Sequence, residues 1–137
     1  MSSPVVVDSC VAYKWFYREN EHGLAQADEL LRAHLERQIV LVGPTTLPVE
    51  LSNTLRYAKL SEEEILHIIE LIEAARVELF PTTTQRLQHA TVLALAHNLC
   101  IYDALFLALA EELGCPLVTA DRRVFANLDT DVEIRLI

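Results

Sequence analysis

The sequence predicts an α/β fold with a central, mainly parallel sheet. Short β-branched and aliphatic runs alternate along the 137-residue chain with longer segments of helical periodicity. Strands separated by helices form βαβ units, in which helices cover both faces of a parallel sheet. In addition, four acidic residues each stand where an apolar run meets an expected helix, which is where such sheets collect their ligands.

The first half of the chain opens with a buried strand at residues 4–8, where three consecutive valines give a β-branched run. A helix over residues 9–17 follows, with an apolar stripe that includes Trp15. Around residues 22–38, apolar residues recur at helical spacing and predict a second helix. Residues 39–42 then form the second strand, which a Gly-Pro pair ends.

The next helix opens at Leu47 or Pro48 and carries Glu50. A capping box starts the helix after it, because Ser61 can accept from an early backbone amide and Glu64 can reach back. In chain order, the remaining elements are a short strand at 77–80, a helix capped by Thr83 or Thr84, a very apolar helix at 103–113, a buried strand at 117–119 and a weaker strand at 132–137.

Length and composition indicate a single globular domain over residues 1–137. Hydrophobic residues make up 52% of the chain and charged residues 23%, and three glycines and five prolines argue against long flexible linkers. No apolar run approaches the roughly 20 residues that span a bilayer, so no membrane association is expected. The first residues lack the basic start and apolar stretch of a secretory signal. A cytoplasmic location is therefore predicted.

The cysteines and histidines do not form a metal-binding pattern. Cys10, Cys100 and Cys115 are odd in number and lack Cys-x-x-Cys spacing, which argues against a disulfide framework or a zinc site. We expect them to be small buried residues of a reduced protein. The five histidines lack His-x-x-x-His and Glu-x-x-His spacing, so we assign them structural or surface positions.

The net charge of −9 is unusual for a nucleic-acid-binding protein, which usually carries a basic footprint. Basic residues nevertheless follow three of the acidic positions in sequence: Lys14 and Arg18, Arg56 and Lys59, and Arg122 and Arg123. They are candidates for local phosphate contacts, although each one taken alone is better explained as solvated surface charge. An acidic surface also suits a basic protein partner.

The candidate site residues are Asp8, Glu50, Asp103 and Asp121. An α/β fold should gather them at the carboxyl edge of its sheet. Clustered carboxylates repel one another, and protons or cations relieve that repulsion. Hard divalent ions prefer oxygen ligands of this kind, which favours a metal-dependent hydrolytic site. The alternative is that the acids are separate helix caps or dipole partners, and their spacing alone does not decide between the two explanations.

Four motifs resemble those of the PIN-domain ribonucleases, in the order of that family and over nearly the whole chain. In order, they are Val-Val-Val-Asp8-Ser-Cys-Val-Ala-Tyr-Lys-Trp-Phe, Pro48-Val-Glu50-Leu-Ser-Asn53-Thr-Leu-Arg, Tyr102-Asp103-Ala-Leu-Phe-Leu-Ala-Leu-Ala-Glu-Glu-Leu-Gly114 and Leu117-Val-Thr119-Ala-Asp121-Arg-Arg-Val-Phe125. The likeness is greatest to the VapC-type toxins of toxin–antitoxin pairs. Cys100 and Ile101 depart from relatives that carry Ser or Thr there, and all four acids are retained.

The resemblance implies a three-layer α/β/α PIN-like fold and a metal-dependent endoribonuclease. The four acids would hold one or two Mg²⁺ or Mn²⁺ ions, and Thr119 would hydrogen-bond to the acidic cluster and orient it. Asn53 lies one helical turn beyond Glu50 and either assists the site or is an ordinary surface amide. Divalent ions lower the pKa of an attacking water and stabilise the leaving oxygen of a phosphodiester.

The resemblance also implies three partners: an RNA substrate, a cognate antitoxin protein that neutralises the enzyme, and a second copy of the chain in a homodimer. The Ile-rich helix after Ser61 is one candidate for the dimer interface. Two other functions stay open at this point. The domain could be a catalytically silent PIN-like binding or assembly module, or a housekeeping RNA or DNA nuclease outside a toxin–antitoxin pair.

Overall fold

The computed structural model describes residues 2–137, and its centre is a five-stranded sheet. The strands are β1 (Ser3–Val7), β2 (Ile39–Pro44), β3 (Glu78–Phe80), β4 (Leu117–Thr119) and β5 (Ile134–Leu136). They lie in the order β3-β2-β1-β4-β5, and every pairing is parallel. The predicted α/β sheet is confirmed, and the carboxyl ends of its strands meet at one edge.

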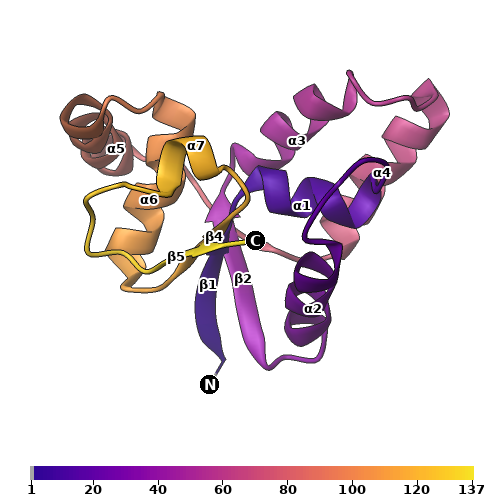
Figure 1. The fold of residues 1–137 in the computed structure, drawn as a ribbon, viewed down its shortest axis with the longest axis horizontal. Helices are drawn as coiled ribbons and strands as arrows, with labels where there is room; N and C mark the ends of the chain where they lie inside the picture. Colours follow the sequence, from indigo (N-terminus) through magenta and orange to yellow (C-terminus); the bar gives the residue numbers. More distant parts are fainter. Residues whose placement is uncertain (1) are drawn as a thin grey trace.

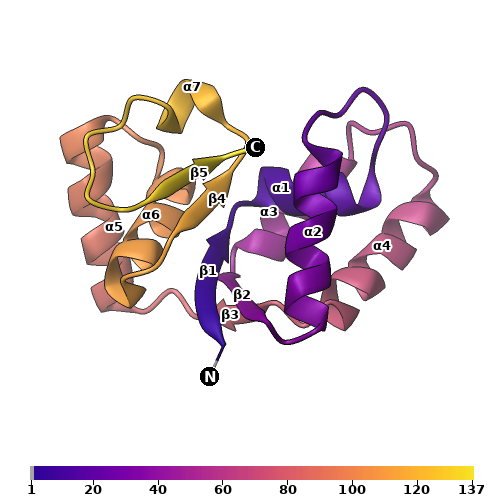
Figure 2. The same cartoon turned by 60° about the horizontal axis from the view of Figure 1, so that its bottom comes forward.

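Within residues 2–137, seven helices connect and cover the strands. They are α1 (Ser9–Phe16), α2 (Leu24–Leu35), α3 (Leu47–Leu55), α4 (Glu62–Ala74), α5 (Thr84–His97), α6 (Ile101–Leu113) and α7 (Arg122–Phe125). Figure 1 and Figure 2 show α1 to α4 on one side of the sheet and α5 and α6 on the other. The three-layer α/β/α arrangement is therefore confirmed, with the short helix α7 directly after β4.

The central strand is β1, whose three valines are almost completely buried. Val6 pairs with Val42 of β2 on one side and with Leu117 of β4 on the other. A strand covered on both faces is expected to be continuously apolar, as this one is. The carboxyl end of β1 is consequently held firmly in the middle of the molecule.

Helix α6 is the main cover of one face of the sheet. Every residue from Ala104 to Ala110 is buried, and the helix contacts β1, β2 and β4, as its apolar girth predicts. No single helix within residues 2–137 is long and apolar enough to cross a membrane, although α5 and α6 together reach that measure across a bend of 112°. Packing of α6 in the core accounts for this apolar character.

The ends of the helices follow their capping residues. The Ser61 hydroxyl accepts from the amide of Glu64 and the Glu64 carboxylate accepts from the amide of Ser61, so the predicted capping box is present. Thr83 caps α5 with a single hydrogen bond, in which its hydroxyl accepts from the amide of Arg86 at 3.2 Å. Helix α2 begins two residues later than predicted, because Gly23 adopts a left-handed φ of 67° immediately before Leu24.

His34 is a structural residue of the core, as predicted. Its ring lies between α2 and two other segments, and Nδ1 accepts from the amide of Leu41 at 3.0 Å. With Nδ1 as the acceptor, Nε2 carries the proton and donates to the carbonyl of Ala75 at 2.8 Å. Both ring nitrogens are therefore satisfied inside the protein.

Candidate active site

All four acidic residues lie at the carboxyl edge of the sheet. Asp8 directly follows β1, and Asp121 comes shortly after β4. These two strands are neighbours, and the chain changes direction across the sheet between them, since β2 and β3 lie on one side of β1 and β4 and β5 on the other. Ligand sites of open α/β sheets form at such a switch point. Glu50 and Asp103 reach the same edge from the first turns of α3 and α6.

Asp8 is the most enclosed of the four, with 5% of its surface exposed. One carboxylate oxygen accepts from the amide of Ser9 at 2.8 Å, and the other accepts from the hydroxyl of Thr119 at 2.8 Å. Burial raises the pKa of Asp8, and repulsion from Asp103 adds to that rise, whereas the Thr119 hydrogen bond opposes it. The side chain is thus held in one orientation at an energetic cost to its negative charge.

Thr119 links the two strand-end acids. Its side chain is completely buried, and its hydroxyl proton is used on Asp8. The hydroxyl oxygen accepts from the amide of Asp121 at 3.1 Å, and the carboxylate of Asp121 in turn accepts from the amide of Val124 at 3.3 Å. A single hydroxyl therefore fixes the position of Asp8 relative to the start of α7.

One carboxylate oxygen of Glu50 lacks a hydrogen-bond partner within residues 2–137. This atom, Oε2, is buried. Burial raises the pKa of Glu50 to about 7, with further contributions from repulsion by Asp8 and by Asp103. A buried carboxylate oxygen without a donor is costly unless a proton or a cation satisfies it.

Asp103 connects the cluster to the basic residues around it. Burial raises the pKa of Asp103, and Asp121 raises it further by repulsion. A hydrogen bond from the Cys100 thiol to Oδ2, at 3.2 Å, and the positive charge of Arg123 both act in the opposite direction. The pKa of Asp103 thus depends both on the negative charge of Asp121, which follows β4, and on the guanidinium of Arg123 on α7.

Helix capping explains only part of this arrangement. Asp8 caps α1 and Asp121 caps α7, as the alternative explanation requires. Asp103, however, is not a cap: α6 begins two residues earlier than predicted, and Cys100 is its N-cap. Capping also gives no reason for the acids to lie so close that repulsion from another acid raises the pKa values of Asp8, Glu50 and Asp103.

The donor set suits a hard divalent ion. It consists of carboxylate oxygens, one of which is buried and unsatisfied, and the acids repel one another, which a cation would relieve. Among residues 2–137, however, no three Asp, Glu, His or Cys side chains stand together as a ready set of ligands. Joint coordination would require the carboxylates to turn toward a common ion.

Two cysteines take part in this network, which the sequence did not lead us to expect. Cys100 is exposed rather than buried, so the prediction was wrong for this residue. Cys10 is half-buried, and its sulfur accepts from the amide of Ala120 at 3.3 Å and lies 3.5 Å from the Thr119 hydroxyl. Only Cys115 is a buried cysteine as predicted. The sequence could have indicated this role through position, because Cys10 lies two residues after Asp8 and Cys100 lies three residues before Asp103.

Three other candidate residues are engaged elsewhere. The amide oxygen of Asn53 accepts from Arg56 at 3.2 Å, and Asn53 is exposed. Lys14 is buried and pairs with Glu21 at 2.9 Å, while Arg18 forms a two-pronged ion pair with Asp28. The suggestion that Lys14 and Arg18 are available for phosphate is therefore wrong for the structure as it stands.

The sequence profile of the PIN domain matches residues 5–131. This chain belongs to the PIN-domain family. Among curated relatives, it is 32% identical over 117 residues to Ribonuclease VapC1 of Mycobacterium tuberculosis, a match that covers 81% of the chain and 85% of the relative. The resemblance found in the four motifs therefore extends over most of the chain.

Solved structures show the same PIN fold. A toxin–antitoxin complex from Klebsiella pneumoniae aligns with a TM-score of 0.66 at 16% identity, covering 95% of this chain and 99% of the other. The Mycobacterium tuberculosis toxin VapC20, described as cleaving the sarcin–ricin loop, aligns with a TM-score of 0.63 at 14% identity, covering 81% and 84%. At these identities, the likeness supports the fold and leaves the activity to be argued from the site.

Proposed function

We propose that this PIN-domain protein is a metal-dependent endoribonuclease of the VapC toxin type. The observation that carries the proposal is the buried, unpartnered oxygen of Glu50 within a group of acids that repel one another. The relation to a curated ribonuclease at 32% identity supports RNA as the substrate. Phosphodiester hydrolysis is the chemistry for which proteins commonly use clustered carboxylates with divalent ions.

Asp8, Glu50, Asp103 and Asp121 are the proposed ligands of Mg²⁺ or Mn²⁺. When bound, such an ion supplies Lewis-acid activation of water and stabilises charge on the phosphate. Asp8 is oriented for this role by Ser9 and Thr119, and Asp121 by the Thr119 hydroxyl. Glu50, with its pKa raised to about 7, can hold or release a proton near neutral pH, and a nearby cation favours its ionised form.

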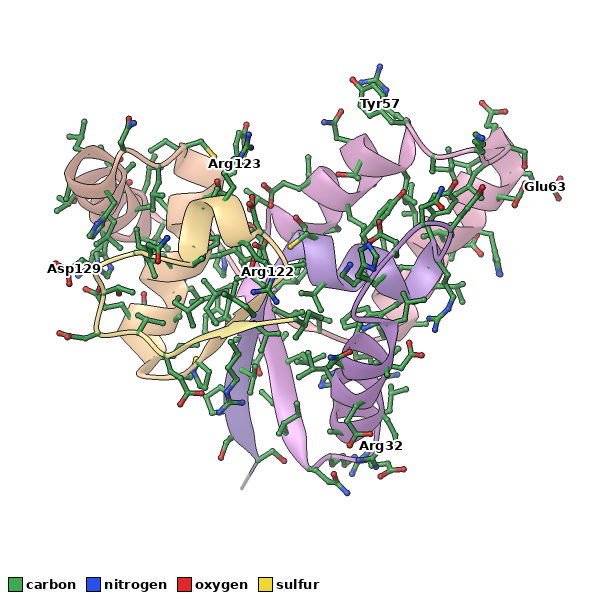
Figure 3. All side chains as sticks on the ribbon, in the orientation of Figure 1. Arg32, Tyr57, Glu63, Arg122, Arg123 and Asp129 are labelled. Carbon is green, nitrogen blue, oxygen red and sulfur yellow. The ribbon has the colours of Figure 1, made fainter. Side chains whose placement is uncertain are left out.

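The test is RNA cleavage by the purified protein in the presence of Mg²⁺ or Mn²⁺. We expect Asp8→Asn and Asp103→Asn each to abolish cleavage, because an amide neither carries the charge nor binds a hard cation as strongly. Asp129→Asn is the matched control, since Asp129 is an exposed acid that projects well away from Arg122 and Arg123, the residues after Asp121 (Figure 3). Cleavage that survives both substitutions and EDTA would falsify the assignment.

The same experiments separate the alternatives. A silent PIN-like module should neither cut RNA nor show divalent binding that depends on the acids, as measured by calorimetric titration. A nuclease that prefers DNA should cut single-stranded DNA faster than RNA of the same sequence. A housekeeping RNA nuclease should cut RNA but show no inhibition by the product of a neighbouring gene.

The proposed partners are a cognate antitoxin and a second copy of the chain. An antitoxin with basic side chains would be attracted to the acidic cluster of this protein, whose net charge is −9. Exposed Leu66 and Ile69 on α4 leave the predicted dimer interface available, and Val92 and Leu95 expose a second apolar surface on α5. Co-purification and analytical ultracentrifugation test these two associations. A cytoplasmic location stays a prediction.

A further inference from the structure

Two arginines at the ends of α2 and α4 have an unusual backbone conformation. Among residues 2–137, the residues other than glycine with a positive φ are Asn20, Arg37, Arg76 and Asn98. Asparagine tolerates this left-handed conformation, whereas an arginine gains nothing locally from it. Arg37 has a φ of 62° and follows the C-cap of α2, and Arg76 has a φ of 56° and follows the C-cap of α4. Glycine is the usual residue at this position of a helix end.

The end of α2 is a complete C-terminal motif in spite of its arginine. The amide of Gln38 donates to the carbonyl of Ala33 at 2.8 Å, and the amide of Arg37 donates to the carbonyl of His34 at 3.0 Å. These are the two hydrogen bonds of a Schellman motif, in which glycine would avoid the steric cost of the left-handed residue. A cation here also complements the negative end of the helix dipole, but Arg32 already provides one in the last turn of α2. The dipole therefore does not account for Arg37.

The two helix ends meet at the buried ring of His34. Its Nε2 atom donates to the carbonyl of Ala75, the residue directly before Arg76, at 2.8 Å. A hollow of about 470 Å³ lies at this junction, and both Arg37 and Arg76 line it. Its volume falls within the range of roughly 300–1,000 Å³ that is typical of small-molecule sites.

The hollow is positively charged although the protein is acidic. No acidic side chain among residues 2–137 lines it, and no ion pair within that range involves Arg37 or Arg76. Much of the remaining wall is aliphatic and includes Leu35, Ile39 and Val40. Two guanidinium groups beside an apolar wall match a ligand that has an anionic group and a less polar remainder.

We propose that this hollow binds a small phosphomonoester, whose phosphate is held between the guanidinium groups of Arg37 and Arg76. A phosphomonoester carries nearly two negative charges at neutral pH and has three terminal oxygens, so it can accept hydrogen bonds from both arginines. A carboxylate has a single charge and is matched by one guanidinium. The aliphatic wall suits a planar, weakly polar remainder such as that of a nucleoside monophosphate.

The proposed site is separate from the acidic cluster. Arg37 and Arg76 precede β2 and β3, so they lie at the amino edge of the parallel sheet, whereas the four acids lie at its carboxyl edge. The inference therefore does not depend on the proposed ribonuclease function, and binding can be measured without any cleavage.

The binding test is calorimetric titration of the protein with adenosine 5′-monophosphate in EDTA, where no divalent ion can hold a phosphate at the acids. We expect the nucleotide to bind, inorganic phosphate to bind more weakly because it leaves the aliphatic wall uncovered, and adenosine not to bind. Arg37→Gly and Arg76→Gly should each weaken nucleotide binding by about tenfold or more, and Arg37→Lys should weaken it less. Lys59→Gln is the charge-matched control, because Lys59 is exposed and does not line the hollow.

Thermal unfolding without ligand gives an independent readout. Arg37→Gly should raise the unfolding temperature, because glycine adopts the left-handed conformation without steric cost, so this variant should gain stability while it loses binding. Asn98→Gly changes the backbone in the same way at the end of α5 and should leave nucleotide binding unchanged. Absence of nucleotide binding, equal binding of adenosine, or undiminished binding by both glycine variants would overturn the proposal. A lower unfolding temperature of Arg37→Gly would also overturn it, since the guanidinium would then serve the helix end.

Discussion

At the scale of single residues, the site depends on one buried hydroxyl. Thr119 has only one proton to donate, and it donates that proton to Asp8. The contact with Cys10 must therefore use the thiol as donor, and burial keeps this thiol protonated by raising its pKa to about 12. Cys10, Thr119 and Asp8 consequently form a directed chain of hydrogen bonds that ends on the carboxylate.

This chain predicts different effects of two substitutions at position 119. Thr119→Val keeps the shape of the side chain but leaves Oδ2 of Asp8 and the amide of Asp121 without their partner, so it should lower the free energy of unfolding by about 2 kcal/mol. It should also weaken the apparent affinity for Mg²⁺ in the cleavage reaction by about tenfold. Thr119→Ser retains the hydroxyl and should keep the affinity for Mg²⁺. Urea unfolding and Mg²⁺-dependent cleavage measure the two effects, and equal behaviour of the variants would show that the hydroxyl does not orient the acids.

At the scale of secondary structure elements, each acid is delivered by the start of a helix. Asp8 and Asp121 precede α1 and α7, whereas Glu50 and Asp103 belong to the first turns of α3 and α6. The partial positive charge of a helix N-terminus moderates the repulsion among the acids in each case. The capping of these helices therefore contributes to the site as well as to the fold, whereas α4 carries none of the four acids.

The capping box of α4 allows this difference to be measured. Ser61→Ala removes the acceptor for the Glu64 amide and should destabilise the protein by about 1 kcal/mol, whereas Ser61→Asn should be nearly neutral because Asn is an equally good N-cap. Cleavage activity well below the unfolding temperature should be unchanged in both variants. A loss of activity without a loss of stability would indicate that α4 positions Glu50 through its contact with α3.

The sequence predicted most elements because their signals are local. The valines of β1, the capping box at Ser61 and the Thr83 cap need only neighbouring residues to act. The start of α6 was misjudged because cysteine is not a usual capping residue, and Cys100 takes that role. The convergence of the acids could be predicted from strand ends, whereas the Cys10–Thr119 contact, across 109 residues, depends on the packing of β4 against β1.

At the scale of the whole molecule, the negative charges of the clustered acids destabilise the folded state. Burial and mutual repulsion raise the pKa values of Asp8, Glu50 and Asp103, so the folded state holds protons that the unfolded chain releases. The net charge of −9 adds a general repulsion that favours expansion of the chain. Binding of a cation at the cluster would offset both effects, which links folding to the proposed metal site.

The linkage predicts how stability depends on pH. For Glu50, the pKa is about 7 in the folded state against an ordinary value of 4.5, so between these values the folded state binds more protons than the unfolded chain. The free energy of unfolding must then fall as the pH rises through this window, and the contribution is lost above about pH 7. Asp8 and Asp103 act in the same direction. We expect urea unfolding in EDTA to show this decline between pH 5 and pH 8, as an approximate range around the shifted pKa.

Divalent ions and one substitution should each remove part of the decline. Mg²⁺ binds the ionised carboxylates of the folded state, so it should raise the unfolding temperature more at the upper end of the pH range than at the lower end. Glu50→Gln cannot ionise and should make the pH dependence in EDTA shallower, with higher stability at the upper end. Glu63→Gln on α4 is the control, since this exposed side chain lies far from Arg122 and Arg123 (Figure 3). Stability that rises with pH in EDTA, or an unchanged slope in Glu50→Gln, would mean that the acids are not held together against their own repulsion.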